Sequence, residues 1–272
     1  MIVRNEERNL PRCLDSVRDL ASEMIVVDTG SSDATPQIAA AYGATVLTFD
    51  FTNADFAAAR NHALAHATGE WILGLDADET LHPTGAPVIQ NLTADNENTG
   101  YYLERHNHSA GSAAPNIDYA VRLFPNRPEF RFRGRVHETI DASILHAGGR
   151  LRKTQIRLDH NFSTDLESRR RRNRWYIDIL LEEIAADPTD DARLDFLAAE
   201  YHQLGMFPEA AAVAERIAQI RPRDPRAHLV AGVYHLLYTQ EPVRARGDFE
   251  QALHLRPNDE EAKLYLRRLE TG

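Results

Sequence analysis

Over the first 80 residues, short apolar segments alternate with segments of helical spacing, and this pattern restricts the possible folds most strongly. Residues 24–27 and 44–49 are rich in β-forming side chains, whereas residues 33–42 between them have the periodicity of a helix. Residues 56–67 predict a further helix, and residues 70–75 predict a buried strand. Strands and helices that alternate at this spacing are typical of an α/β domain with a parallel sheet.

Polar residues follow the predicted strands of this region, including a first strand that ends at residues 2–3. The polar segments are Arg4-Asn5-Glu6, residues 28–33 and residues 76–79. Parallel sheets bind ligands at the carboxyl ends of their strands, because those ends meet at one edge of the sheet. We therefore expect the three polar segments to form a ligand site together.

Two aspartates, Asp76 and Asp78, are separated by one residue directly after a predicted strand. A divalent hard cation prefers carboxylate oxygens and keeps coordination places for phosphate oxygens and water. Such a cation bridges a diphosphate and stabilises the charge that develops as a leaving group departs. The pair predicts a metal and diphosphate site.

Asp28 ends the preceding strand, and it has two possible roles. Aspartate is common in turns and at helix N-termini, which is the structural alternative. Because Asp33 or Ser32 is better placed to cap the next helix, Asp28 is available to a ligand. A carboxylate at this place accepts a hydrogen bond from a group such as the imide N–H of uracil.

The alternation of strands and helices gives way to several short β-rich segments over residues 100–160. The expected strands are residues 101–105, 119–124, 130–133 and 155–159. We interpret this region as a mixed-sheet half that carries acceptor contacts, and we place the first domain at residues 1–164.

An internal repeat follows a predicted connecting helix at 165–187. Pro188, Pro222 and Pro257 are spaced by 34 and 35 residues, which matches the tetratricopeptide period. Residues that fit the repeat are Leu194, Leu197, Ala198, Tyr201, Gly205, Phe207, Ala210, Ala245, Phe249 and Ala252. Residues 188–272 therefore predict an all-α repeat region that binds the first domain, a protein partner or a second copy; an ordinary helical hairpin is the alternative.

Residues 168–174 hold five arginines beside Trp175. One interpretation is a solvated helix face, and the other is a basic site for a diphosphate or an anionic acceptor.

The overall charge restricts the partners and the compartment. The formal net charge is −10 and the pI is about 5.6, which disfavours nucleic acid as a partner. The single cysteine, Cys13, excludes an internal disulfide and fits a reducing compartment, and we interpret it as a core residue. No apolar segment approaches the ~20 residues that span a bilayer. We expect a cytoplasmic protein, with a peripheral position at the inner membrane left open.

Four motifs in order, held in three segments, carry a resemblance to a known family: MIVRNEERNLPRCL, IVVDTGSSDAT and AAARNHALAHATGEWILGLDADE. They resemble the family 2 glycosyltransferases of the GT-A fold over residues 1–82. The GRVHE segment at 134–138 and the repeat tail are similar to the branch with lipopolysaccharide-core glucosyltransferases and peptide S-glycosyltransferases. The resemblance implies a mixed, mainly parallel sheet flanked by helices and a nucleotide-diphosphate sugar donor, with UDP preferred.

The resemblance also implies roles for individual residues. Arg4, Asn5 and Glu6 would line the nucleoside pocket beside Asp28, and Arg60 would reach the base or the diphosphate. Asp76 and Ala77 would also contact the donor, and Asp76 would bind the ribose or a metal-bound water. Asp78 and His160 would bind Mn²⁺ or Mg²⁺. Imidazole suits Mn²⁺ better than Mg²⁺.

Related enzymes invert the anomeric centre by direct displacement, which needs a carboxylate to deprotonate the acceptor. Glu138 in GRVHE is our candidate for this base, and Asp141 is the reserve. Many relatives have an acidic pair here, whereas this chain has His137-Glu138, so His137 is a candidate to orient the donor phosphate.

Three functions stay open at this point. The first is an inverting transfer of a hexose to a saccharide, a lipid-linked glycan or a peptide. The second is a sugar nucleotidyltransferase, which is disfavoured because the segment after the first strand is acidic and free of glycine. The third is an inactive scaffold with protein-binding repeats.

Overall fold

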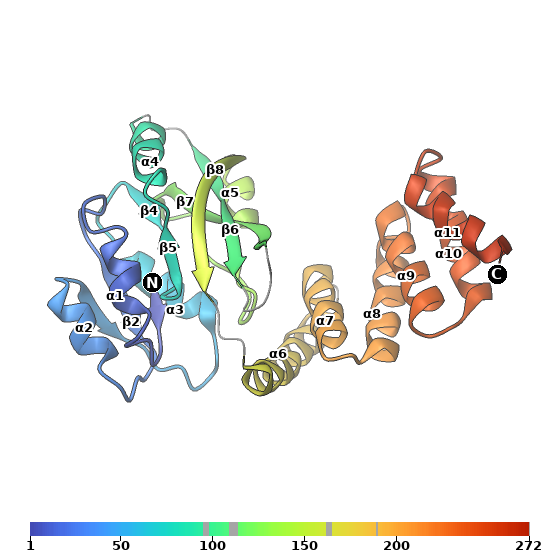
Figure 1. Cartoon of the computed structure of the whole chain (residues 1–272), viewed down its shortest axis with the longest axis horizontal. Coiled ribbons are helices and arrows are strands. Elements are labelled where there is room, and N and C mark those ends of the chain that lie inside the picture. The colour runs from blue at the N-terminus through green and yellow to red at the C-terminus, as the bar shows by residue number, and fades with distance from the viewer. Residues whose placement is uncertain (95–97, 109–113, 162–164, 189, 272) are drawn as a thin grey trace. The chain divides into compact units, whose positions relative to one another are not determined.

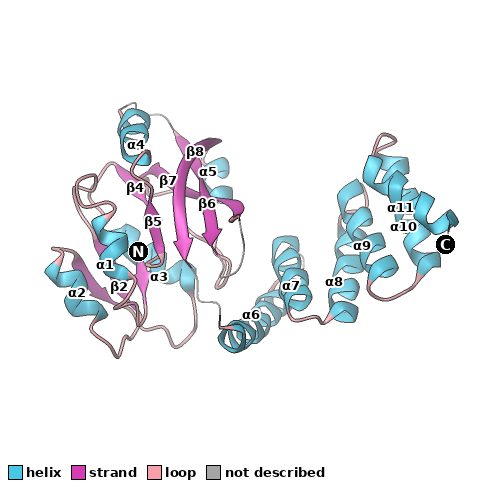
Figure 2. Ribbon diagram, in the orientation of Figure 1, coloured by secondary structure: helices cyan, strands magenta, loops and turns pink. Residues whose placement is uncertain are grey.

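The computed structural model describes residues 1–94, 98–108, 114–161, 165–188 and 190–271. The chain divides into two compact units, Met1–Thr164 and Asp165–Gly272. Strands occur in the first unit, and the described part of the second unit is helical (Figures 1 and 2).

A parallel three-stranded sheet begins the first unit, in the order β1-β2-β3. Its strands and helices are β1 (Ile2–Val3), α1 (Leu10–Asp15), β2 (Ile25–Asp28), α2 (Thr35–Ala41), β3 (Thr45–Thr48) and α3 (Phe56–His66). The buried side chains Val3, Leu10, Leu14, Val26, Ala39 and Ala77 form one core cluster. These elements confirm the strand and helix alternation predicted for this region, because its apolar faces meet in this core.

A five-stranded sheet completes the unit, in the order β4-β7-β6-β8-β5. Its elements are β4 (Trp71–Leu73), β5 (Glu79–Leu81), α4 (Gly85–Thr93), β6 (Thr99–His108), β7 (Asn116–Pro125), α5 (Asp141–His146) and β8 (Arg150–Asn161). β6 and β8 are parallel, whereas β4–β7, β6–β7 and β5–β8 are antiparallel. The unit is therefore mixed as predicted, but parallel pairing does not dominate, because β4 pairs with the returning strand β7.

Two further expectations need correction. Residues 130–133 are not a strand, since only an isolated bridge between Arg133 and Thr139 forms there. Phe130 is buried in a core cluster that Phe132 contacts, so the alternation of that segment reflects packing rather than pairing. The sequence predicts a buried strand at residues 70–75. The strand that forms is Trp71–Leu73, and its residues are half-buried.

The second unit contains helices α6 (Leu166–Ala186), α7 (Asp191–Gln203), α8 (Phe207–Ile220), α9 (Pro225–Leu237), α10 (Pro242–Leu255) and α11 (Glu260–Thr271). Leu194, Ala210 and Phe249 of the predicted repeat are fully or almost fully buried. Gly205 has a φ of +75° in the turn between α7 and α8, where a side chain would be strained. The repeat interpretation is confirmed, because α7–α8 and α9–α10 are successive hairpins that bury the predicted repeat positions.

The arginine-rich segment lies on α6, and Arg170, Arg171, Arg172 and Arg174 are exposed. This exposure agrees with a solvated helix face. Across the described ranges, no helix combines the length and the apolar character that crossing a membrane requires.

Candidate active site

The polar segments that follow β1 and β2 are joined by hydrogen bonds. The backbone N–H of Asn5 donates to Ser31 Oγ at 2.9 Å, and the Ser32 N–H donates to Asn5 Oδ1 at 2.8 Å. The Glu6 N–H donates to Thr35 Oγ1 at 2.7 Å. Asn5 has a φ of +57°, a left-handed conformation that asparagine tolerates. Thus the structure brings the first two predicted segments together, and it leaves Arg4 and Asn5 exposed beside them.

Asp28 is buried at the end of β2, where its carboxylate accepts the backbone N–H groups of Gly30 at 3.2 Å and Ser31 at 3.1 Å. The structural role in the turn is therefore present. Asp33 accepts the N–H of Thr35 at 3.0 Å, but the N-cap of α2 is Ala34 and no side chain caps it, so the capping predicted for Asp33 or Ser32 does not form. A carboxylate accepts more than two hydrogen bonds, so these turn contacts do not prevent Asp28 from binding a nucleobase. That contact stays a prediction.

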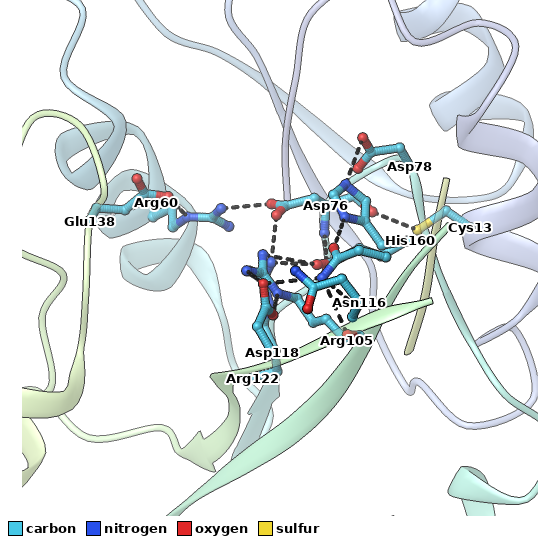
Figure 3. A network of polar contacts seen from close by, with 12 residues as sticks. Cys13, Arg60, Asp76, Asp78, Arg105, Asn116, Asp118, Arg122, Glu138 and His160 are labelled. Carbon is cyan, nitrogen blue, oxygen red and sulfur yellow. Dashed lines mark hydrogen bonds and ion pairs between the residues drawn. The ribbon is translucent and has the colours of Figure 1, made fainter. Parts of the chain in front are cut away.

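Asp76 lies between two arginines that occupy both of its carboxylate oxygens (Figure 3). Arg60 of α3 donates to Oδ1 at 2.6 Å, and Arg122 of β7 donates to Oδ2 at 2.5 Å. Burial favours the neutral acid, but the charges of Arg122 and Arg60 outweigh burial and hold the pKa of Asp76 well below its usual range. Because its oxygens face arginines, this geometry favours a donor-binding role for Asp76 over a place in the metal shell.

Arg122 and Glu79 form a buried layer beneath Asp76; our sequence interpretation placed Glu79 in the polar segment 76–79 without a role of its own, and it missed Arg122. Arg122 donates to Glu79 Oε1 at 2.6 Å, and Glu79 Oε2 accepts the Asp76 N–H at 3.0 Å. Glu79 is fully buried, and burial raises its pKa although Arg122 opposes this effect. In sequence, the signal was a lone arginine inside the apolar segment AVRLFP of β7.

Glu138 joins this cluster from a distant loop. Its Oε1 accepts a hydrogen bond from Arg60 Nε at 2.5 Å, and its side chain is 12 % exposed. For Oε2 there is no hydrogen-bond partner among the described residues. His137 precedes it with a φ of +50°, a left-handed value that is uncommon for residues other than glycine but that histidine adopts more often than most. Arg60 therefore connects the predicted base to the predicted donor-binding aspartate.

The reserve base, Asp141, is engaged elsewhere. Its Oδ2 accepts the hydroxyl of Tyr102 at 2.7 Å, and burial together with Asp141 raises the pKa of that hydroxyl. This contact favours Glu138 over Asp141 as the candidate base.

Asp78 and His160 meet at the ends of the neighbouring strands β5 and β8, with Asp78 Oδ2 and His160 Nε2 3.2 Å apart. Burial lowers the pKa of His160, but the hydrogen bond and charge of Asp78 raise it above its usual value. The site thus favours positive charge between these two atoms. Their separation is close to the ~3 Å between neighbouring ligands of an octahedral Mg²⁺ or Mn²⁺ shell with bonds of ~2.1 Å.

Over the part of the chain that the structure describes, no group of three His, Cys, Asp or Glu side chains is arranged to hold a metal ion. Two protein ligands nonetheless fit a divalent cation that takes its remaining oxygens from a diphosphate and water. Asp78 and His160 therefore suit the predicted metal, which stays untested.

Two neighbours of the acidic motif have buried side chains. Ala77 is 4 % exposed and packs in the core, so that only its backbone is suited to contact a donor. Cys13 is buried as predicted, its thiol lies 3.4 Å from the Asp76 carbonyl oxygen, and burial raises its pKa to about 12. A thiol with this pKa is not a nucleophile at neutral pH.

Comparison with known proteins now decides the family. Residues 1–157 match the model for "Glycosyl transferase family 2". The chain belongs to glycosyl transferase family 2. This match covers more than half of the chain and includes every site residue described above except His160.

Relatives of this family 2 chain include a TPR repeat-containing protein of Synechococcus elongatus, which is 46 % identical over 147 residues, or 53 % of this chain and 35 % of that protein. The SPbeta prophage-derived glycosyltransferase SunS of Bacillus subtilis is 27 % identical over 222 residues, which cover 77 % of this chain and 50 % of SunS. The chain thus spans about a third to a half of the length of these curated relatives.

Among solved structures, residues 1–349 of S. aureus TarS in complex with UDP-GlcNAc align with a TM-score of 0.53 at 15 % identity. The alignment covers 97 % of this chain and 90 % of the TarS chain. At this identity the likeness concerns the fold, and it confirms the predicted GT-A architecture.

Proposed function

We propose that this chain transfers a hexose from a UDP-sugar to a saccharide, lipid-linked glycan or peptide acceptor, with inversion and with Mn²⁺ or Mg²⁺. The observation that carries the proposal is the pairing of Asp78 with His160 beside the Asp76–Arg60–Glu138 chain. These contacts support a cation site at Asp78 and His160 and a candidate base at Glu138. UDP is the nucleotide implied by the resemblance, and UDP-GlcNAc in the TarS structure makes it a reasonable probe.

The donor would be held by residues of the strand-end segments. Asp28 and the exposed Arg4 and Asn5 are placed to contact the nucleoside, and Asp78 and His160 would hold the metal. When bound, the metal supplies positive charge that stabilises the departing diphosphate.

The acceptor would be activated by Glu138. Because Arg60 binds Oε1, Oε2 is the oxygen available to accept the proton of an acceptor hydroxyl or thiol as it attacks. Arg60 also binds Asp76, so that it orients the base relative to the donor.

The second candidate function is an inactive scaffold. The helical repeats favour it, because they offer a surface to a protein partner or a second copy. Family membership disfavours the nucleotidyltransferase. A cytoplasmic location, with the inner-membrane surface left open, stays part of the proposal.

Calorimetry with UDP and Mn²⁺ tests the proposal. We expect UDP to bind in the presence of Mn²⁺ and to lose this affinity in EDTA, because the metal bridges the diphosphate to the protein. Asp78→Ala should abolish the Mn²⁺-dependent part of binding as well as donor hydrolysis and transfer. Metal-dependent binding of equal strength in variant and parent would remove Asp78 from the site, and no nucleotide binding by the parent would support the scaffold.

Glu138→Gln separates donor binding from chemistry. The amide keeps an oxygen for Arg60 but cannot take up a proton, so we expect unchanged UDP affinity and a loss of transfer of about 10²-fold or more. Glu129→Gln, a change outside the described cluster, is the control and should transfer at the parental rate. Persistent transfer by Glu138→Gln would place the base elsewhere.

A further inference from the structure

Asn107 of β6 lies beside His160 of β8, and the two residues are partners in the parallel register. The Asn107 amide has neighbours on both sides. Its Nδ2 lies 3.0 Å from the carbonyl oxygen of Asn116 and 3.2 Å from Asp118 Oδ2, while its Oδ1 lies 2.6 Å from His160 Nδ1. Carbonyl and carboxylate oxygens only accept hydrogen bonds, so the NH₂ end of the amide must face them.

This orientation decides the tautomer of His160. The amide oxygen of Asn107 only accepts a hydrogen bond, and therefore His160 Nδ1 must carry the proton that it receives. A neutral imidazole has one N–H, which leaves a lone pair on Nε2. Asp78 Oδ2 lies 3.2 Å from Nε2 and also accepts, so the space between these two atoms holds either a proton on Nε2 or a cation in its place.

We propose that Asn107 and Asp118 are positioning residues that hold His160 as its Nδ1–H tautomer and present Nε2 as a ligand to a divalent cation. The inference rests on the metal site of the proposed function. Histidines that bind metals usually donate their second N–H to an acceptor, which orients the ring and strengthens it as a ligand. Asp118 is itself held by Arg105 through hydrogen bonds of 2.6 and 2.8 Å, so an ion pair supports the amide orientation (Figure 3).

The Nδ1 proton is measurable by NMR in the complex with UDP and the diamagnetic ion Mg²⁺. Protein with ¹⁵N-labelled histidine is compared with His160→Gln to assign the His160 ring nitrogens. We expect a protonated Nδ1 and an Nε2 without a proton in the parent complex, because the cation takes the place of the Nε2 proton. In Asn107→Leu, which has a similar size but no amide oxygen, the Nδ1 signal should shift because its proton loses its acceptor. An unchanged His160 spectrum in Asn107→Leu would overturn the inference.

The affinity for Mn²⁺ in the presence of UDP, followed by electron paramagnetic resonance, is the second readout. We expect Asn107→Leu to weaken Mn²⁺ binding ~10–100-fold. The double variant Asn107→Asp/Asp118→Asn keeps an oxygen acceptor for Nδ1–H and supplies an amide NH₂ opposite the new carboxylate, so it should recover most of the lost affinity. A loss of equal size in this double variant and in Asn107→Leu would contradict a role through the His160 hydrogen bond.

Asn126→Leu is the matched control. The Asn126 amide donates to the carbonyl oxygens of Ala67 and Gly69 at 3.0 and 2.9 Å, away from His160. Its loss removes a comparable structural contact, and Mn²⁺ affinity should stay parental. A loss matching that of Asn107→Leu would mean a general structural effect and would overturn the inference.

Asp78→Ala, measured in parallel, distinguishes a failure of the proposed metal site from a failure of the role of Asn107. If Asp78→Ala binds Mn²⁺ as the parent does, the metal site of the proposed function is wrong, and this inference fails with it. If Asp78→Ala loses Mn²⁺ while Asn107→Leu retains it, the metal site stands and only the role of Asn107 is overturned.

Discussion

Three carboxylates at the site are held by two guanidinium groups. Asp76 and Glu79 face the guanidinium group of Arg122, and Arg60 bridges Asp76 to Glu138. A buried ion pair is weak support for stability, because the loss of hydration offsets its attraction. Such a network is instead costly to break, and it defines where each carboxylate lies relative to a ligand.

Arg122→Met should therefore destabilise the first unit strongly. The change removes the closest cation from the fully buried Glu79 and leaves Asp76 with Arg60 alone, for a cost of about 3–5 kcal/mol. Urea unfolding followed by Trp71 fluorescence in a Trp175→Phe background reports the first unit.

Arg18→Met is the control for this change. Arg18 pairs with Asp15 at 3.1 Å on the surface, where both side chains are more than half exposed. Surface pairs contribute less than about 1 kcal/mol, so this variant should unfold close to the parent. Similar small effects from both changes would show that the network under Asp76 is hydrated and adaptable.

The helices of the second unit stack through small residues. Gly232 of α9 packs against Phe249 of α10, and Phe249 is fully buried and stacks on Tyr265 of α11 with ring centres 5.1 Å apart. A Cβ on Gly232 would lie 2.6 Å from Phe249 Cε1. The close approach of α9 and α10 thus depends on the absence of a side chain at this position.

Two Gly→Ala changes test this packing at the level of the helices. Alanine in a helix gains about 1 kcal/mol over glycine, whereas overpacking costs about 1–3 kcal/mol. Gly232→Ala should therefore lower the stability of the second unit, measured as helix loss in thermal circular dichroism. Gly247→Ala in α10, where a Cβ would meet nothing within 4 Å, should raise the stability instead. Stabilisation by both changes would mean that Phe249 moves aside freely.

In the molecule as a whole, chemistry and repeats belong to different units. The site residues described above lie between Arg4 and His160 in the first unit, whereas the helical repeats lie in Asp165–Gly272. Family 2 membership concerns residues 1–157. This division makes the proposed transfer and the proposed partner binding separable properties, each testable through its own residues.

Much of the fold follows from local patterns in the sequence. The alternation of strands and helices, the polar segments after β1 and β2 and the 34-residue repeat were readable because periodicity and turn residues act over a few positions. The same patterns misjudged residues 130–133, whose apolar side chains serve the core without pairing.

The identities of Asp76, Asp78, Arg60, Glu138 and His160 as site candidates came from motifs, but their partners did not. Arg122 and Glu79 are 43 positions apart, and Asp78 and His160 are 82 positions apart. Such contacts depend on the register of β5, β7 and β8, which no local pattern encodes. Sequence alone therefore determined which chemical groups are present and which segments carry them. Only the tertiary structure decided which carboxylate faces arginine and which faces imidazole, because long-range strand pairing sets those distances.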